Sequence, residues 1–72
     1  MNRRVSGYPF TYDELARMIG QFAPFAGGPL APALVYMLLY RIENDPALTD
    51  AQKADLEGRV ALAFPGVEPY RP

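Results

Sequence analysis

The sequence predicts a small all-α domain of three helices, with extended arms at both ends. Two observations lead to this prediction. Apolar residues recur at helical spacing in three separate stretches, and capping residues, prolines or glycines start or stop each stretch. The predicted boundaries within this single domain of 72 residues are an arm over 1–10, helices over 12–22, 32–43 and 50–63, and a tail over 65–72.

The first helix has a clear start signal and one apolar stripe. Thr11 followed by Glu14 forms a capping box, in which the two side chains satisfy backbone amides at the helix start. Phe10, before the cap, can pack on the fourth helical residue as a hydrophobic staple. The residues of the stripe recur at i, i+3, i+4 and i+7 and should face the core. They are Leu15, Met18, Ile19 and Phe22.

Residues 23–31 should connect the first two helices. Pro24, Pro29 and the pair Gly27–Gly28 cannot continue a helix, because proline lacks an amide hydrogen and glycine loses the most backbone entropy on ordering. Phe25 lies in the middle of this connection, and we expect its ring to return to the hydrophobic core.

The second helix is predicted to be the central hydrophobic element. Pro32 suits its first turn, where a missing amide hydrogen has no intrahelical acceptor to lose. The side predicted to face the core comprises Leu34, Val35, Leu38, Leu39 and Ile42. The opposite side is not polar either, and comprises Ala33, Tyr36, Met37 and Tyr40.

The third helix also begins with a capping box, formed by Thr49 and Gln52. Asp55 and Arg59 lie four residues apart, which suits an ion pair on its outer side. Ala54, Gly58 and Ala61 are small, which permits a close approach to another helix, although Gly58 costs about 1 kcal/mol in helix propensity. The predicted core stripe comprises Leu56, Val60, Ala63 and Phe64.

The composition excludes most catalytic and metal chemistry. There is no cysteine and no histidine, and Ser6 is the single serine. The usual nucleophile–base pairs, thiolate and imidazole metal sites and disulfides therefore have no residues to form them. We expect a non-enzymatic protein without cofactor, metal or small-molecule substrate, in a setting compatible with the cytoplasm.

The carboxylates do not suggest an acid–base pair or a cation site. Asp13 and Glu14 lie in the first turn of a helix, where the helix dipole favours negative charge. Asp55 and Glu57 should point to different sides of the third helix. The spacing of a calcium-binding loop does not occur in the sequence.

A nucleic-acid-binding function is one alternative. The segment TYDELARMIG resembles the first helix of many helix-turn-helix domains. The resemblance implies a recognition helix three or four residues later, rich in polar and basic side chains. The segment that follows has a longer loop and lacks such side chains, and seven basic against eight acidic residues give a net charge of −1. We therefore prefer other functions.

Membrane association is a second alternative. From Met18 to Tyr40 there is no charged residue, and this stretch is long enough to cross a bilayer. Three prolines and a glycine pair interrupt it, however, and only about a dozen residues from Leu30 are densely apolar. A buried core helix explains that length better.

The preferred prediction is a protein-interaction or accessory subunit that forms homo-oligomers or docks on a larger protein partner. Two short helices can cover only one side of the second helix, and an exposed apolar patch of that size usually marks a partner site. The alternative is that the N-terminal arm or the C-terminal tail folds over that side, with Tyr8, Phe10 or Tyr70 as plugs. The predicted partner-binding residues are Tyr36, Met37, Tyr40, Ala33, Tyr8 and Tyr70.

Overall fold

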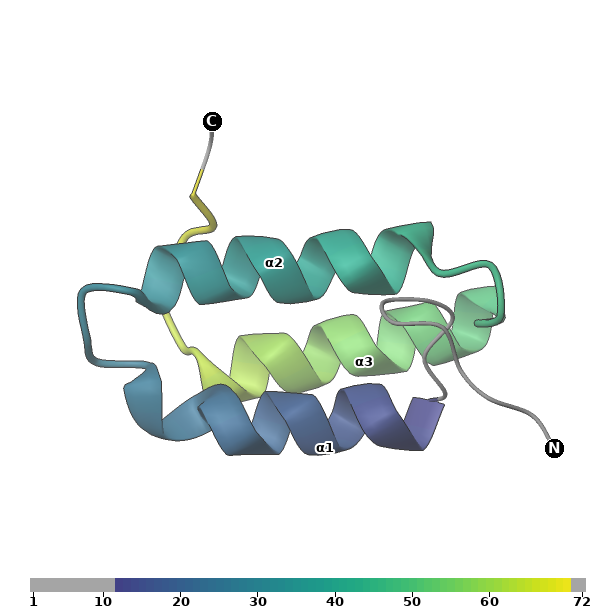
Figure 1. The fold of residues 1–72 in the computed structure, drawn as a ribbon, viewed down its shortest axis with the longest axis horizontal. Coiled ribbons are helices and arrows are strands. Elements are labelled where there is room, and N and C mark those ends of the chain that lie inside the picture. Colours follow the sequence, from purple (N-terminus) through teal and green to yellow (C-terminus); the bar gives the residue numbers. More distant parts are fainter. Residues whose placement is uncertain (1–11, 71–72) are drawn as a thin grey trace, which may run out of the picture.

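A computed structural model describes residues 12–70 of the chain, and over this range the protein is an all-α domain without strands (Figure 1). Its helices are α1 (Tyr12–Phe22), α2 (Ala31–Asn44) and α3 (Asp50–Ala63), and a short 3₁₀ turn, η1 (Ala23–Phe25), follows α1. Consecutive helices run in opposite directions along the long axis. The predicted helix boundaries are correct for α1 and α3, and within one residue at each end for α2.

Helix α1 packs through the predicted stripe. Leu15 and Ile19 are buried, and Met18 and Phe22 are half-buried against the same cluster. Four apolar side chains on one face drive this helix onto its neighbours. The predicted capping box and staple involve Thr11 and Phe10, which lie outside the described residues.

The connection after α1 departs from the prediction for Phe25. The chain continues into η1, where the amide of Ala26 donates to the carbonyl of Ala23 over 3.0 Å. This tight turn leaves the ring of Phe25 54% exposed, so the prediction that it enters the core is wrong. Ala26 packs against the core instead.

Helix α2 supplies the largest set of buried side chains of the three helices. Pro32 lies in its first turn, as predicted. Leu34 and Leu39 of the predicted core face are half-buried at its edges, where they still pack against the core. The fully covered positions on one side of the helix are Ala31, Val35, Leu38 and Ile42.

The turn after α2 is built by an aspartate. Asp45 is fully buried, and its Oδ1 accepts a hydrogen bond from the amide of Ala47 over 2.9 Å. An aspartate that binds the amide two residues on mimics a backbone turn, and Pro46 fixes the next φ angle. The turn carries Leu48 into the core, a position that the periodicity of the helices did not reveal.

Helix α3 packs against both other helices. The Thr49 hydroxyl accepts from the amide of Gln52 over 3.1 Å, and the Gln52 side chain accepts from the amide of Thr49 over 3.0 Å, which confirms the capping box. Leu56 and Val60 are buried on the face toward the core. Gly58 faces outward, where an added methyl group would meet no atom within 4 Å, so no other helix approaches closely at that position.

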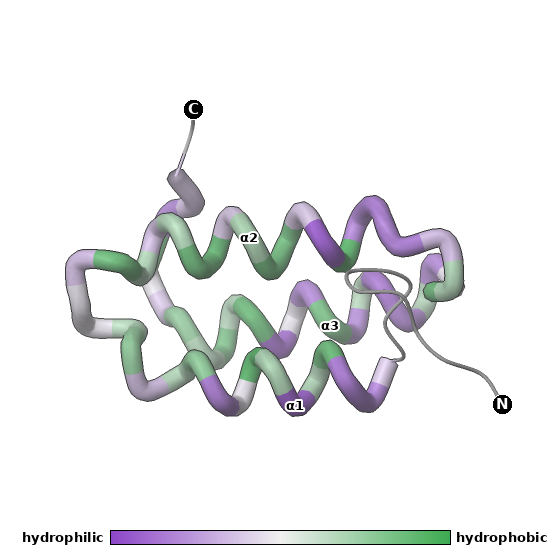
Figure 2. Tube along the Cα trace, in the orientation of Figure 1, coloured by the Kyte–Doolittle hydropathy of each residue, from purple (hydrophilic) through white to green (hydrophobic). Residues whose placement is uncertain are grey.

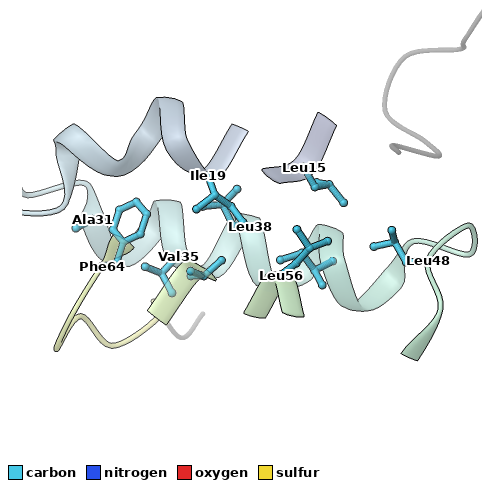
Figure 3. Close-up of a cluster of buried hydrophobic side chains, with 10 residues drawn as sticks. Leu15, Ile19, Ala31, Val35, Leu38, Leu48, Leu56 and Phe64 are labelled. Atoms are coloured by element: carbon cyan, nitrogen blue, oxygen red, sulfur yellow. The ribbon is translucent and has the colours of Figure 1, made fainter. Parts of the chain in front are cut away.

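The core is one continuous apolar cluster between the three helices (Figure 3). Phe64 lies beside Ala31 and Val35 at one end, and Leu48 closes the other end. Of the ten buried core residues within 12–70, nine are leucine, isoleucine, valine or phenylalanine, and burying each such side chain contributes about 1.5–3 kcal/mol to a fold without disulfides. Figure 2 shows apolar segments in all three helices, with polar residues between them.

A proline–glycine turn directs the chain after α3. The amide of Val67 donates to the carbonyl of Phe64 over 3.2 Å, and Gly66 has a φ of 76°. Pro65 followed by a glycine with positive φ is the pattern of a type II turn. The turn sends residues 67–70 across to the first turn of α2, where the Tyr70 amide donates to the Pro32 carbonyl over 2.9 Å.

Candidate interaction surface

The outer side of α2 presents two stacked tyrosines. Tyr36 and Tyr40 lie one helical turn apart, and their rings stack with centroids 6.2 Å apart and planes at 27°. Both positions follow from the pitch of the helix, because Val35, Leu38 and Ile42 turn toward the core and leave the opposite side to solvent. Tyr36 is 38% exposed and Tyr40 is 54% exposed.

A third tyrosine comes from the tail. The ring of Tyr70 meets the ring of Tyr36 edge-on, with centroids 6.1 Å apart and planes at 85°. Tyr70 covers part of Tyr36 and is itself 54% exposed, so its own ring becomes part of the aromatic surface. We call the surface formed by Ala33, Tyr36, Tyr40 and Tyr70 the tyrosine face.

Four of the six predicted partner-binding residues therefore belong to one surface. Ala33 is exposed beside the tyrosines on the same side of α2. Met37, the fifth, is half-buried and packs against the core. It lies one turn after Leu34, on a flank of the helix, and so contributes less to the outer side than predicted. Tyr8 lies outside the described residues.

A shallow groove of about 140 Å³ adjoins the tyrosine face between α2, α3 and the tail. Pro69 lines it, and the next residue, Tyr70, rests on Tyr36. The lining is apolar except for one carboxylate, that of Glu57. The lining residues are Val35, Leu39, Glu57, Val60, Ala61, Phe64, Val67 and Pro69.

Two carboxylates meet at the α2–α3 side of this groove. Partial burial of Glu57, together with the hydrogen bond and the negative charge of neighbouring Glu43, raises the pKa of Glu57 above its ordinary value. The Lys53 ammonium opposes this shift, and it donates a hydrogen bond to the backbone carbonyl of Glu43 over 3.1 Å. This pair was not predicted from the sequence, because Glu43 and Glu57 lie far apart along the chain and come together only across the antiparallel α2–α3 hairpin.

A polar cluster ties α1 to α3 away from the groove. The Tyr12 hydroxyl donates to Asp55 Oδ2, which also accepts from Arg59 Nε over 3.0 Å. The Arg59 guanidinium lies over the Tyr12 ring, 5.7 Å from its centroid. The hydrogen bonds from Tyr12 and Arg59 lower the pKa of Asp55. The predicted Asp55–Arg59 ion pair is confirmed, and Tyr12 is its unpredicted third member.

The remaining exposed apolar side chains are scattered. Phe25 and Leu30 lie in and beside the first connection, and Leu62 is on the outer side of α3. Within residues 12–70, no three acidic side chains gather as a metal site would require. Each helix in this range also falls short of the length and continuous apolarity needed to cross a membrane.

No protein-family model, curated protein or solved structure matches the chain.

Proposed function

We propose that the chain is a small non-enzymatic protein-interaction module that docks on a protein partner through its tyrosine face. The observation that carries the proposal is the grouping of Tyr36, Tyr40 and Tyr70, brought from two distant parts of the chain into one partly exposed aromatic surface. Tyrosine is enriched in interfaces because it covers much area and keeps a polar tip.

The size of the tyrosine face suits the centre of an interface. A tyrosine side chain buries about 150–250 Å² when it is covered completely, so three rings that are 38%, 54% and 54% exposed offer roughly 200–350 Å². A stable interface buries about 800 Å² on each partner. The groove beside Pro69 and the helix surfaces around it supply additional area for the same partner.

A different protein suits this surface better than a second copy of the chain. Homo-oligomers usually pair the same patch around a twofold axis. If the interface included the adjoining groove, such pairing would bring two copies of the Glu43–Glu57 carboxylate pair into one interface, and negative charge on both sides opposes association. We therefore favour docking on a partner over homo-oligomerisation.

Nucleic-acid binding and membrane association gain less support from the described residues. A recognition helix needs polar and basic side chains on its exposed side. On α2 that side instead carries Ala33, Tyr36, Tyr40, Glu43 and Asn44. The lengths of the helices do not favour membrane insertion. For the interaction itself we propose the cytoplasm, since the chain uses no disulfide for its stability.

The test is affinity capture with a surface variant and a matched control. The full chain is immobilised, captured proteins from the host cell are identified by mass spectrometry, and each is purified and titrated against the chain. We expect Tyr36→Glu/Tyr40→Glu to weaken binding at least tenfold, because two charges would be placed in the contact. The control is Ala51→Glu/Ala54→Glu, which adds the same charges to exposed positions of α3.

Light scattering completes the test by giving the mass in solution. A monomer that captures a partner and loses it only with the tyrosine variant supports the proposal. Equal binding by both double variants would contradict it. A wild-type dimer that becomes a monomer with the tyrosine variant would assign the face to homo-oligomerisation instead.

A further inference from the structure

The groove between α2, α3 and the tail has the size of one side-chain site. Its volume of about 140 Å³ is well below the roughly 300–1,000 Å³ of pockets that hold drug-sized molecules. A cavity of about 150 Å³ accommodates a benzene-sized group. The groove therefore fits a single leucine, methionine or phenylalanine side chain.

The lining of the groove gives this site two chemical parts. The apolar part comes from Leu39 of α2, Ala61 of α3 and Phe64, which directly follows α3. Glu57 contributes a carboxylate to the same lining, and Glu43 places a second negative charge beside it. Lys53 is the cation that acts on Glu57, and its ammonium also hydrogen-bonds to a backbone carbonyl. Two carboxylates beside one ammonium leave excess negative charge at the edge of the groove where Glu57 lies.

We propose that the groove anchors a basic, apolar segment of a partner protein, with a large apolar side chain between Leu39 and Phe64 and a lysine or arginine paired with Glu57 and Glu43. This inference rests on the proposed function and specifies the chemistry of the partner. The cation relieves the repulsion between the two carboxylates, and the apolar side chain fills the groove. Because Tyr70 follows Pro69 directly, the same segment continues onto the tyrosine face.

A library of random twelve-residue peptides displayed on phage supplies the probe. It is selected on the immobilised full chain, and enriched peptides are synthesised and titrated by fluorescence anisotropy. We expect them to share a leucine, methionine or phenylalanine within about one helical turn of a lysine or arginine. Enrichment of peptides that lack a basic residue would overturn the proposal.

Two variants with matched controls locate the binding site. Ala61→Leu fills the groove from an exposed helical position, and Ala54→Leu makes the same change on an exposed position that does not line it. Glu57→Gln removes the carboxylate, and Asp13→Asn removes a charge from α1. We expect each groove variant to raise the Kd about tenfold and each control to change the Kd less than twofold. Equal effects of the variants and their controls would overturn the proposal.

Two other occupants are distinguished by the same titration. Arg3 and Arg4 could supply the cation from the chain itself, so an affinity that rises several-fold with Arg3→Ala/Arg4→Ala would overturn the proposal in favour of the N-terminal segment. A dimer that Ala61→Leu converts to a monomer would assign the groove to a second copy. If partner capture depends on Tyr36 and Tyr40 while the groove variants change nothing, the proposed function stands and the groove proposal fails.

Discussion

The edge of one ring of the Tyr36–Tyr70 pair faces the other ring at an angle of 85°, and this contact joins the tail to the outer side of α2. Aromatic pairs in this geometry contribute about 0.5–1.5 kcal/mol beyond the area they bury. The hydrogen bond from the Tyr70 amide to Pro32 lies beside the ring contact. The two contacts hold Pro69 at one edge of the groove and the Tyr70 ring in the tyrosine face.

Tyr36→Ala should loosen the tail without unfolding the helices. We expect the Tyr70 amide to exchange with solvent several-fold faster, because its hydrogen bond loses the support of the ring contact. Hydrogen exchange followed by NMR measures this directly. Tyr36→Phe keeps the ring and is the control. Unchanged exchange at Tyr70 in the alanine variant would show that the hydrogen bond alone holds the tail.

Gly58→Ala and Gly66→Ala should change stability in opposite directions. Gly58 lies in the middle of α3 with open space around it, so alanine should raise the free energy of unfolding by about 0.5–1 kcal/mol. Gly66 has a φ of 76°, which strains any other residue, and we expect a loss of about 1 kcal/mol or more. Urea denaturation measures both values. A loss at Gly58 would indicate a packing role for that position.

The helices could be predicted from the sequence because their signals are local. The stripe that contains Leu15 and Ile19, and the capping box at Thr49, depend on residues within one or two helical turns. Phe25 was wrongly placed in the core, because no local pattern tells which way a ring leaves a short 3₁₀ turn.

The candidate site could be predicted only in part for a related reason. The stack of Tyr36 on Tyr40 follows from the spacing of one helix. The contact with Tyr70 and the meeting of Glu43 with Glu57 depend on how distant segments cross, which one sequence does not specify. The groove is formed by the same crossing.

Leu38→Ala and Leu62→Ala should separate core packing from helix propensity. Leu38 is fully buried between the helices, so its truncation should lower the free energy of unfolding by about 2–5 kcal/mol. Leu62 is 84% exposed on α3, and the same change there should stay within about 0.5 kcal/mol. Thermal and urea unfolding give both numbers. A large loss with Leu62→Ala would place that side chain in a contact that the isolated chain does not show.

Glu57→Gln and Asp55→Asn should have opposite effects on stability at neutral pH. The pKa of Glu57 is raised from an ordinary value of 4.5, so its ionised form is penalised in the folded state. Removing that charge should raise the free energy of unfolding at pH 7, by less than about 1 kcal/mol because the side chain is partly exposed. The pKa of Asp55 is lowered from 3.8, so its ionised form stabilises the fold, and Asp55→Asn should lower the stability at pH 7.

The two effects should disappear on acidification in different pH windows. The penalty at Glu57 is relieved as the pH falls through its raised folded-state pKa, and the gain from Glu57→Gln should be gone below the unfolded-state value near 4.5. The stabilisation from Asp55 is lost only as the pH falls below 3.8 and through its lowered folded-state pKa. Urea denaturation of both variants and the wild type between pH 7 and pH 2.5 measures these windows. A gain from Glu57→Gln that persists at the lowest pH would show that its origin is packing and not charge.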